Sequence, residues 1–266
     1  MKYIVDTLEL GNFHTESGEV IENLKLRYEH VGYQGQPLVL VCHALTGNHL
    51  TYGTDEEPGW WREIIDGGYL PIHDYQFLTF NVIGSPFGSS SPRNDPNFPQ
   101  QLTLRDIVRA IERGVKALGF KHIAILIGGS LGGMQVQELL YNRQFQVEKA
   151  VILAATDKTS SYSRAFNDIA RQAIHLGGKE GLSIARQLGF LTYRSSKSYE
   201  ARFTPEQVVS YQHHQGDKFK ESFDVACYKT LLDVLDSHNL DRGRTDVAEV
   251  LAQLDTKVLT LSLIHI

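Results

Sequence analysis

The sequence predicts an α/β protein in which a mostly parallel β-sheet is flanked by helices and carries a helical insertion. Two features of the 266-residue chain support this prediction. Short apolar runs alternate with helical patterns over the first part of the chain, and a run that is apolar throughout, such as 38–42, is typical of a strand buried on both faces of a parallel sheet. From about residue 160 to residue 238 the chain shows helical patterns only, which indicates a cap inserted over one edge of the sheet.

The expected strands follow from these runs and from alternation. Two loosely alternating segments, 3–10 and 24–31, predict an antiparallel entry hairpin. The other strands belong to the parallel part of the sheet, with helices as crossovers. They are expected at 37–42, 77–82, 123–127, 150–155 and 256–261.

The expected helices follow from helical spacing and capping signals. Thr103 and Asp106 form a capping-box pattern before an apolar stripe that Gly119 ends. Thr204 is a candidate N-cap, because Pro205 follows in the first turn. Helices are expected at 103–118, 134–141, 163–176, 181–188, 204–213, 224–235 and 247–254. The resulting division is a first core part at 1–157, a helical lid at 158–240 and a second core part at 241–266.

The composition indicates a protein that can bury a hydrophobic core and that has no nucleic-acid partner. A chain of 29.9 kDa with 42% hydrophobic residues suits one large α/β domain with an insertion. Its 26 basic and 31 acidic residues give a formal net charge of −5, so no basic excess favours nucleic-acid binding.

Local features of the sequence predict the location of the protein, the redox state of its cysteines and whether it holds a metal site. No apolar run approaches the ~20 residues of a membrane span, and Asp6 and Glu9 lie where a signal peptide would be apolar. We therefore expect a cytoplasmic protein without a membrane partner. Cys42 and Cys227, the only cysteines, are expected to be reduced thiols. No HExxH or comparable spacing occurs, so no metal site is expected.

The stretch 125–135 marks the candidate active site. Gly128, Ser130 and Gly132 fill the pattern G-x-S-x-G between an apolar strand and a helix. In this α/β-hydrolase pattern the serine occupies a strained turn that lifts its Oγ above the carboxyl edge of the sheet, and the glycines let the backbones approach. The helix that follows stabilises negative charge at its N-terminus. The pattern predicts Ser130 as the nucleophile.

The same architecture predicts an oxyanion hole made of two backbone N–H groups. One belongs to Leu131, next to the nucleophile, and the other is assigned to Leu45, in the loop that follows strand 37–42. His43 precedes the nucleophile, whereas the usual order in this architecture is Ser, acid, His. We therefore interpret His43 as a hydrogen-bonded residue that shapes the loop.

Further motifs on both sides of Ser130 narrow the comparison to one family. Gly-Gly-Ser-Leu-Gly-Gly-Met-Gln surrounds Ser130, and His-Ala-Leu-Thr-Gly lies upstream at 43–47. The lid region adds Arg-Gln-Ala-Ile at 171–174, Gly-Leu-Ser-Ile-Ala-Arg at 181–186, Leu-Thr-Tyr-Arg-Ser at 191–195, Gln-Gly-Asp-Lys-Phe at 215–219, and the segment 237–244. This combination resembles the homoserine O-acetyltransferases of the α/β-hydrolase superfamily.

The resemblance implies a ping-pong acyl transfer in methionine biosynthesis. Ser130 would take the acetyl group of acetyl-CoA, a co-substrate, and pass it to the hydroxyl of L-homoserine with no cofactor. By motif position, Arg186 and Tyr193 of the lid would hold the amino-acid substrate, and a guanidinium suits a carboxylate because it binds in a bidentate manner. A homodimer is also implied by the family.

The resemblance further implies a triad acid and histidine that this sequence does not place. In the family the acid follows the strand after the lid and the histidine follows the last strand; here the first of these strands is 257–261, and neither family segment is found. His265 lacks the family context, and Asp157 ends a strand that supplies the acid in other α/β-hydrolases but not in this family. We expect a chain without a working triad and without the final strand and helix of the sheet.

Several alternatives stay open. The sequence does not decide between acetyl and succinyl donors, or between homoserine and serine acceptors, because one methylene contributes only ~1–3 kcal/mol in a pocket. An esterase of the same fold is disfavoured by Arg186 and Tyr193, since hydrolysis needs no carboxylate clamp. The last alternative is an inactive fragment that lacks the triad acid and histidine.

Overall fold

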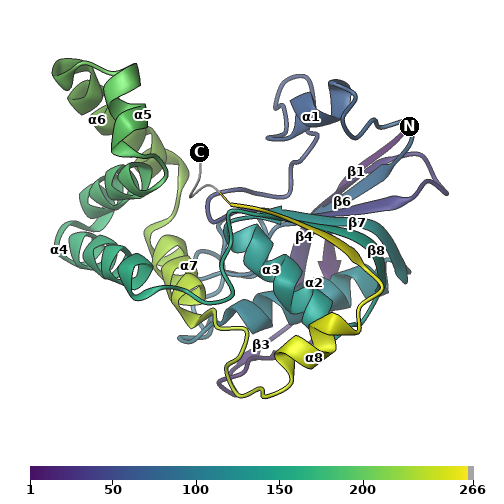
Figure 1. Ribbon diagram of the computed structural model, residues 1–266. Coiled ribbons are helices and arrows are strands. Elements are labelled where there is room, and N and C mark those ends of the chain that lie inside the picture. The colour runs from purple at the N-terminus through teal and green to yellow at the C-terminus, as the bar shows by residue number, and fades with distance from the viewer. Residues whose placement is uncertain (263–266) are drawn as a thin grey trace.

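The computed structural model describes residues 1–262 and shows a twisted seven-stranded sheet with helices on both faces (Figure 1). The strands are β1 (Lys2–Glu9), β4 (Lys25–Gly32), β5 (Leu38–Cys42), β6 (Gln76–Phe80), β7 (His122–Gly129), β8 (Gln146–Leu153) and β9 (Lys257–Leu261), and a separate ribbon is formed by β2 (Phe13–His14) and β3 (Val20–Ile21). They lie in the order β1-β4-β6-β5-β7-β8-β9. β4 is antiparallel to both neighbours, and each pair from β6 to β9 is parallel. The predicted mostly parallel sheet is confirmed.

The entry hairpin is also confirmed, with one addition. β1 and β4 pair antiparallel from Lys2 opposite Gly32 to Glu9 opposite Lys25. The small β2–β3 ribbon lies in the connection between them and was not expected. It is too short to produce a periodic pattern, so the sequence shows only a polar connection there.

The helices cover the two faces unequally. α2 (Leu104–Ala117) and α3 (Leu131–Asn142) pack on one face, and α1 (Arg62–Asp66) lies over the other (Figure 1). The remaining helices are α4 (Ser161–Thr192), α5 (Ser196–Arg202), α6 (Pro205–Ser222), α7 (Val225–Ser237) and α8 (Val247–Ala252). The capping box at the start of α2 forms as predicted, because Thr103 accepts from the Asp106 N–H and the Asp106 carboxylate accepts from the Thr103 N–H.

The central strands are buried on both faces, which explains their unbroken apolar runs. In β5, Leu38, Leu40 and Cys42 join the core cluster under α2 and α3, whereas Val39 and Val41 join the cluster under α1. Alternate residues of one strand therefore fill opposite cores. At the far edge, the apolar side chains of β9 are about half exposed: Val258 is 50%, Leu259 51% and Leu261 50% exposed.

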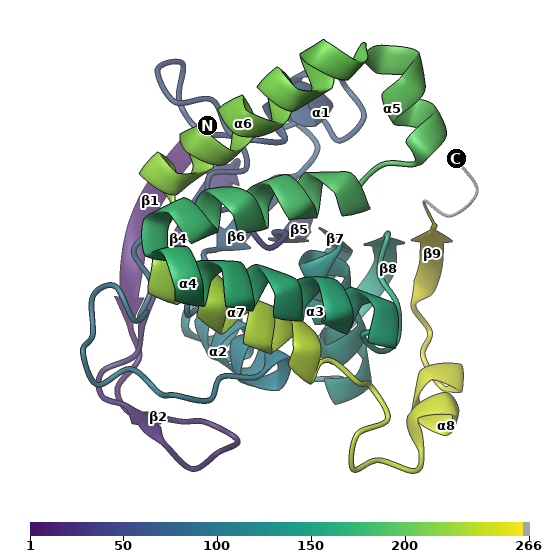
Figure 2. The same cartoon turned by 90° about the vertical axis from the view of Figure 1, so that its left-hand side faces the viewer.

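Between β8 and α8, residues 161–237 form helices with short connections, as the sequence predicts, and they stand beside the carboxyl edge of the parallel strands (Figures 1 and 2). The two helices expected at 163–176 and 181–188 run together as α4, which bends sharply at Gly178 (φ 54°). α5 was not expected, and α6 extends nine residues beyond the predicted end at 213, to Ser222. Both contain many polar residues, which weakens the apolar periodicity that a prediction uses.

α7 differs from the other helices of this segment because it belongs to the main core. Tyr228, Leu231 and Leu232 are at most 2% exposed and join the cluster formed with α2 and α3. Where the chain enters and leaves the segment, two short stretches pair: the Thr159 N–H donates to the His238 carbonyl, and the Leu240 N–H donates to the Asp157 carbonyl. We call residues 157–159 and 238–240 the lid root. No helix within residues 1–262 is both long and apolar enough to cross a membrane.

Candidate active site

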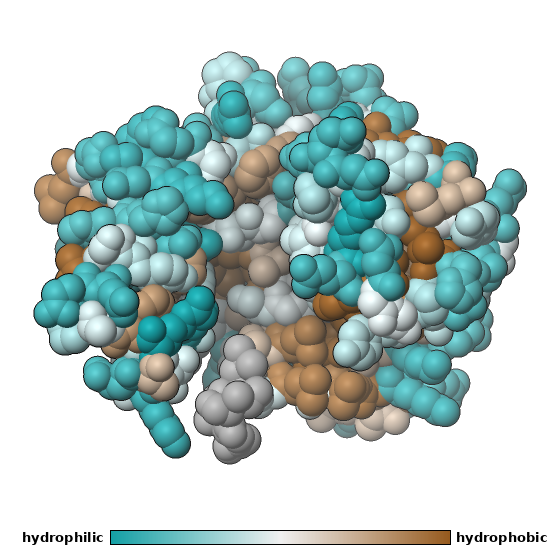
Figure 3. Space-filling model, turned by 90° about the horizontal axis from the view of Figure 1, so that it is seen from above, coloured by the Kyte–Doolittle hydropathy of each residue, from teal (hydrophilic) through white to brown (hydrophobic). Residues whose placement is uncertain are grey.

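Ser130 lies at the turn from β7 into α3 with an unusual backbone conformation. Its φ of 54° and ψ of −122° fall in a region that a non-glycine residue rarely adopts, so the surrounding structure must hold it there. Its N–H donates to the Leu153 carbonyl at 2.9 Å, and its carbonyl accepts from the Met134 N–H at 3.1 Å. The serine itself is exposed, and the molecule is hollowed between the lid helices and the core (Figure 3).

The turn depends on glycines that touch neighbouring backbone. A Cβ on Gly132 would lie 2.0 Å from the Cys42 carbonyl oxygen, and one on Gly128 would lie 2.4 Å from the Gly132 carbonyl carbon. A Cβ on Gly133 would lie 2.6 Å from the Ala155 Cβ. These positions therefore require glycine for close approach, as the pattern predicts for Gly128 and Gly132.

Leu45 and Leu131 carry backbone N–H groups at neighbouring strand ends. Leu131 is the first residue of α3, so its N–H has no partner within the helix. Leu45 lies in the turn after β5, which the Gly47 N–H to Ala44 carbonyl bond closes at 2.9 Å. Within the described residues neither N–H donates to a protein acceptor. β5 and β7 are adjacent and parallel, with Cys42 opposite Gly128, so both turns begin at one edge of the sheet.

His43 has the shaping role that the sequence analysis assigned to it. Its Nδ1 donates to the Ala44 carbonyl at 2.8 Å, and its Nε2 accepts from the Val82 N–H at 3.0 Å. The ring is fully buried, and burial lowers the pKa of His43 to about 4. A neutral ring with both nitrogens engaged cannot take a proton from Ser130.

Glu29 is a residue of this region that sequence reasoning missed. It is 1% exposed, and its carboxylate accepts 2.8 Å bonds from three consecutive backbone N–H groups, those of residues 51–53. It thereby anchors the far end of the loop that begins at His43. Burial raises the pKa of Glu29, and the three donors oppose that rise. The available signal was a charged residue at an inward position of the predicted strand 24–31.

Arg186 lies between two aromatic rings of the lid. Its guanidinium carbon is 4.4 Å from the ring centre of Phe190 and 4.7 Å from that of Phe219. Within residues 1–262 it has no carboxylate partner. Apart from its hydrogen bond with the Tyr193 hydroxyl, a cation that stacks on rings without an ion pair keeps donors of its planar edge available for an anion.

Tyr193 and Tyr228 lie close to this guanidinium. Burial raises the pKa of both tyrosines, and the Arg186 charge opposes the rise in each. Tyr193 is 51% exposed, and its hydroxyl, which is hydrogen-bonded with Arg186, lies 3.3 Å from where a Cβ on Gly189 would stand. The structure therefore brings Arg186 and Tyr193 together, as the resemblance implies.

The described residues hold no base beside Ser130. His238 is buried, and its Nε2 lies 2.9 Å from the Thr156 carbonyl and 3.1 Å from Gln137 Oε1. Asp157 is exposed in the lid root, and no histidine within residues 1–262 bonds its side chain. His265 lies outside the described residues.

The structure places the two cysteines and the side chains that could bind a metal as follows. Cys42 and Cys227 are buried and form no disulfide, as predicted. In the part of the chain that the structure describes, no three His, Cys, Asp or Glu side chains gather as a metal site would require.

Comparison with known proteins defines first the class and then the family. Residues 37–176 match the family model described as "alpha/beta hydrolase fold", so the chain is an α/β-hydrolase. It is 35% identical over 280 residues to the homoserine O-acetyltransferase of Thermus thermophilus, covering 91% of this chain and 73% of the relative. That of Carboxydothermus hydrogenoformans is 31% identical, with 93% and 77% covered. The chain belongs to the homoserine O-acetyltransferase family of enzymes.

Solved structures agree with this assignment. The crystal structure of a homoserine O-acetyltransferase from Staphylococcus aureus superposes with a TM-score of 0.96 at 79% identity, covering 99% of this chain and 80% of that one. The acetyl esterase MekB superposes with a TM-score of 0.79 at 18% identity over 96% of this chain and 79% of its own, which shows the shared fold alone.

The glycine contacts predict a sharp difference between two substitutions in the same turn. Gly132→Ala places a Cβ against the Cys42 carbonyl, so we expect a loss of about 3 kcal/mol or more in the free energy of unfolding. Gly129→Ala is the matched control, because its Cβ would be no closer than 3.6 Å to the Leu153 Cβ. Denaturant titration measures both. Equal stability of the two variants would contradict the close contact.

The buried histidines predict a loss of stability in acid. Burial lowers the pKa of His43 and of His49 to about 4, with Arg27 and His43 adding to the effect on His49. The unfolded chain, with ordinary histidine pKa values near 6.5, binds more protons between pH 6.5 and 4. The contribution is therefore complete above pH 6.5 and is lost as the pH falls, by about 1.4 kcal/mol per pH unit for each ring.

Urea titrations between pH 7 and pH 5 test this expectation. His49→Gln should reduce the slope of the free energy of unfolding against pH. His73→Gln, whose side chain is 73% exposed, is the control and should leave the slope unchanged. The same slope in all three proteins would show that His49 does not titrate as its burial requires.

Proposed function

We propose that this chain transfers an acetyl group from acetyl-CoA to the hydroxyl of L-homoserine through an acyl-Ser130 intermediate, in the biosynthesis of methionine. One arrangement supports the proposal most strongly. A strained, exposed serine lies at the N-terminus of α3, and the lid carries Arg186, which has no carboxylate partner among residues 1–262. The first feature suits acyl transfer, and the second suits an amino-acid substrate.

The first half-reaction uses the turn. Ser130 Oγ attacks the thioester carbonyl carbon, and the carbonyl π electrons move to oxygen. The N–H groups of Leu131 and Leu45 would hold that oxyanion, each contributing ~3 kcal/mol to the barrier reduction. Collapse of the adduct breaks the C–S bond, so that CoA leaves as its thiol with the proton that the Ser130 hydroxyl gave up, and the acyl ester stays on Ser130.

The second half-reaction uses the lid. The homoserine hydroxyl oxygen attacks the acyl carbon, the bond between that carbon and Ser130 Oγ breaks, and Ser130 takes up the proton that the homoserine hydroxyl loses. Arg186 would pair with the substrate carboxylate in a bidentate manner, with the Tyr193 hydroxyl beside it. This clamp favours an amino-acid acceptor over water, because a bound hydroxyl reacts with the ester as an intramolecular nucleophile. Hydrolysis as the main reaction is therefore the less supported alternative.

The remaining parts of the proposal are supported by the family. The proposed reaction uses acetyl-CoA as a co-substrate and no cofactor, and we place it in the cytoplasm, where acetyl-CoA is available. Succinyl-CoA as donor and serine as acceptor are the alternatives that the test below separates.

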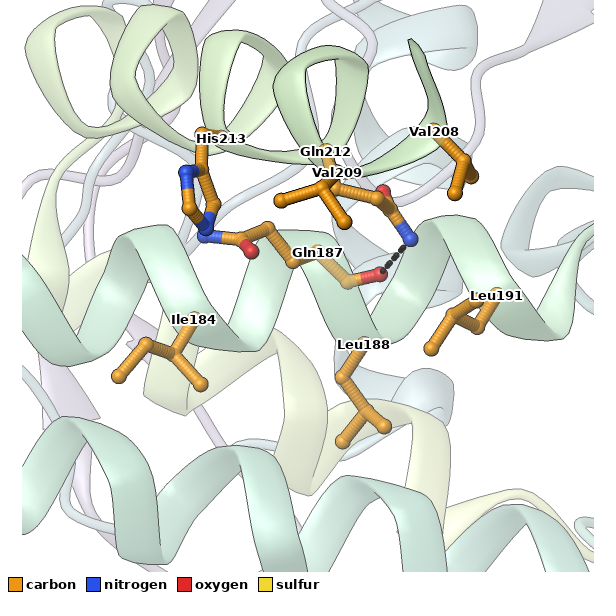
Figure 4. A pocket seen from close by; sticks show the side chains of 8 residues that line it. All are labelled: Ile184, Gln187, Leu188, Leu191, Val208, Val209, Gln212 and His213. Atoms are coloured by element: carbon orange, nitrogen blue, oxygen red, sulfur yellow. Dashed lines mark hydrogen bonds between the residues drawn. The ribbon is translucent and has the colours of Figure 1, made fainter. Parts of the chain in front are cut away.

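We also propose a homodimer that forms through the lid. The second half of α4 lies beside α6, and an open hollow of about 410 Å³ lies between the two helices (Figure 4). Ile184, Leu191 and Val209 beside it are 56%, 52% and 54% exposed. Apolar residues at helical spacing on two paired helices match a second such pair, which would complete a four-helix bundle about a two-fold axis. A second copy of the chain is therefore the occupant we propose.

The acyl-enzyme predicts a covalent adduct. After incubation with acetyl-CoA, intact-mass spectrometry should show one acetyl group, and peptide mapping should locate it on Ser130. Ser130→Ala should remove the adduct, and Ser160→Ala, which changes only the cap of α4, should keep it. A succinyl adduct in place of the acetyl one would contradict the donor.

Complete absence of an adduct would contradict the acyl-enzyme step in this chain. A label that forms only after the chain is joined to the C-terminal segment of a relative would assign the failure to a missing base. With added acceptors, O-acetylhomoserine rather than O-acetylserine or free acetate is the expected product.

The dimer proposal predicts that charge in the hollow separates the copies. Light scattering should give twice 29.9 kDa for the unmodified chain and half that value for Val209→Glu. Tyr69→Glu is the control, because Tyr69 is 81% exposed and lies just after α1, away from the lid. A monomer before any substitution, or a dimer that survives Val209→Glu, would overturn the proposed interface.

A further inference from the structure

The lid root is held by a buried ion cluster that the proposed chemistry does not use. Glu138 of α3 is at its centre, with its side chain 2% exposed. Its Oε1 accepts from Arg105 Nε at 3.3 Å, and its Oε2 accepts from Arg244 Nη2 at 2.7 Å. One buried carboxylate thus pairs with two guanidinium groups from distant parts of the chain, and Glu16, whose Oε1 lies 3.7 Å from Arg105 Nη1, is a second carboxylate at the cluster.

Both arginines donate hydrogen bonds to the backbone of the segment that leaves the lid. Arg105 Nη2 donates to the carbonyls of Asn239, Leu240 and Arg242, at 3.3, 3.4 and 2.7 Å. Arg244 Nη1 donates to the Leu240 carbonyl at 3.0 Å. The cluster therefore fixes the path of residues 239–242, of which Asn239 and Leu240 belong to the lid root.

α3 connects this cluster to the reactive serine. Ser130 is the N-cap of α3, and Glu138 lies eight residues later, so about 12 Å of rigid helix separates them. Gln137, beside Glu138, has its Oε1 3.1 Å from His238 Nε2. Gln137 therefore contacts the lid root directly, and Glu138 next to it does so through the two arginines.

α7 connects the lid root to the lid cation. It ends at Ser237, whose Oγ accepts from the Leu104 N–H at the start of α2 at 2.9 Å. Near its other end, the Tyr228 ring packs 5.4 Å from that of Phe219, over which Arg186 lies. A small rotation of α7 at its root would displace Arg186 relative to Ser130.

We propose that Glu138 is a positioning residue that, through Arg105 and Arg244, sets the position of the lid cation Arg186 relative to Ser130. The inference rests on the proposed function only in naming homoserine as the ligand of Arg186. α3 and α7 act as two rigid arms that meet at the lid root, where Gln137 contacts His238, and a misplacement of about 1 Å at a binding clamp is enough to weaken it greatly.

Substitution of the carboxylate by an amide tests the proposal on the full chain. Glu138→Gln keeps the size and removes the charge that pairs with both arginines, so that Arg105 keeps only its longer ion pair with Glu16. We expect about tenfold weaker binding of L-homoserine by titration calorimetry, with the affinity for acetyl-CoA changed less than twofold. Hydrogen exchange should increase in 157–160 and in α7 but not in β5 or β7. Arg244→Lys keeps the charge and should restore most of the homoserine affinity that Arg244→Leu loses.

The matched control separates positioning from general stability. Glu112→Gln removes another buried carboxylate between α2 and α3. The Glu112 side chain is 8% exposed and accepts from Asn142 Nδ2 at 2.8 Å, and it contacts no residue of the lid root. It should lower the unfolding temperature without changing homoserine binding. Equal weakening by Glu112→Gln, or unchanged binding and exchange in Glu138→Gln, would overturn the proposal. If Glu138→Gln fails to fold, the two Arg244 variants decide the question.

The failure of the proposed function gives a different result. If neither the unmodified chain nor Arg186→Gln binds homoserine, the assigned substrate is wrong. The exchange measurement then still decides whether Glu138 fixes the lid root, because it needs no ligand.

Discussion

The structure depends on one close contact, that of the Gly132 backbone with the Cys42 carbonyl. A Cβ at residue 132 would lie 2.0 Å from that oxygen, so α3 begins directly against the end of β5. This contact forces the chain through a tight turn and leaves Ser130 with a φ of 54°. It also brings the start of α3 beside the turn that carries Leu45, because β5 and β7 are neighbours in register. The strain at Ser130 is thus a consequence of packing that many surrounding contacts stabilise.

Buried charges hold the loops around this turn, although burial alone makes them costly. Glu29 binds the N–H groups of residues 51–53, and Glu138 binds Arg105 and Arg244. An apolar side chain at either place would not fix a particular loop path, because dispersion contacts are not directional. A carboxylate requires its donors at set distances and angles, so it selects one conformation. Here one carboxylate acts on the loop that follows β5, and the other acts on the segment that leaves the lid.

The sequence predicts the parts of this structure that local pattern determines. The glycine pattern around Ser130, the apolar runs of the central strands and the capping box at Thr103 each need only a few neighbouring residues, and each was found as expected. The clustering of Arg186 and Tyr193 was implied by family resemblance and not by spacing. α5, the β2–β3 ribbon and the placement of α7 in the main core carry no local signal, since they are decided by tertiary contacts. Glu138 and Arg244 are separated by more than one hundred residues, and nothing in the sequence shows that they meet.

On the proposed function, there is a chemical reason why the turn stabilises the oxyanion and the lid selects the acceptor. The tetrahedral adduct on Ser130 carries the same oxyanion whether water or an alcohol attacks the acyl ester, so the two backbone N–H groups cannot distinguish the acceptors. Discrimination must come from groups that touch the acceptor elsewhere, and the lid supplies a cation held between Phe190 and Phe219. Such a clamp is useful only at a fixed distance from Ser130. A lid that is attached to the core through α7, and to the helix of Ser130 through Glu138, would keep this distance fixed without any hinge.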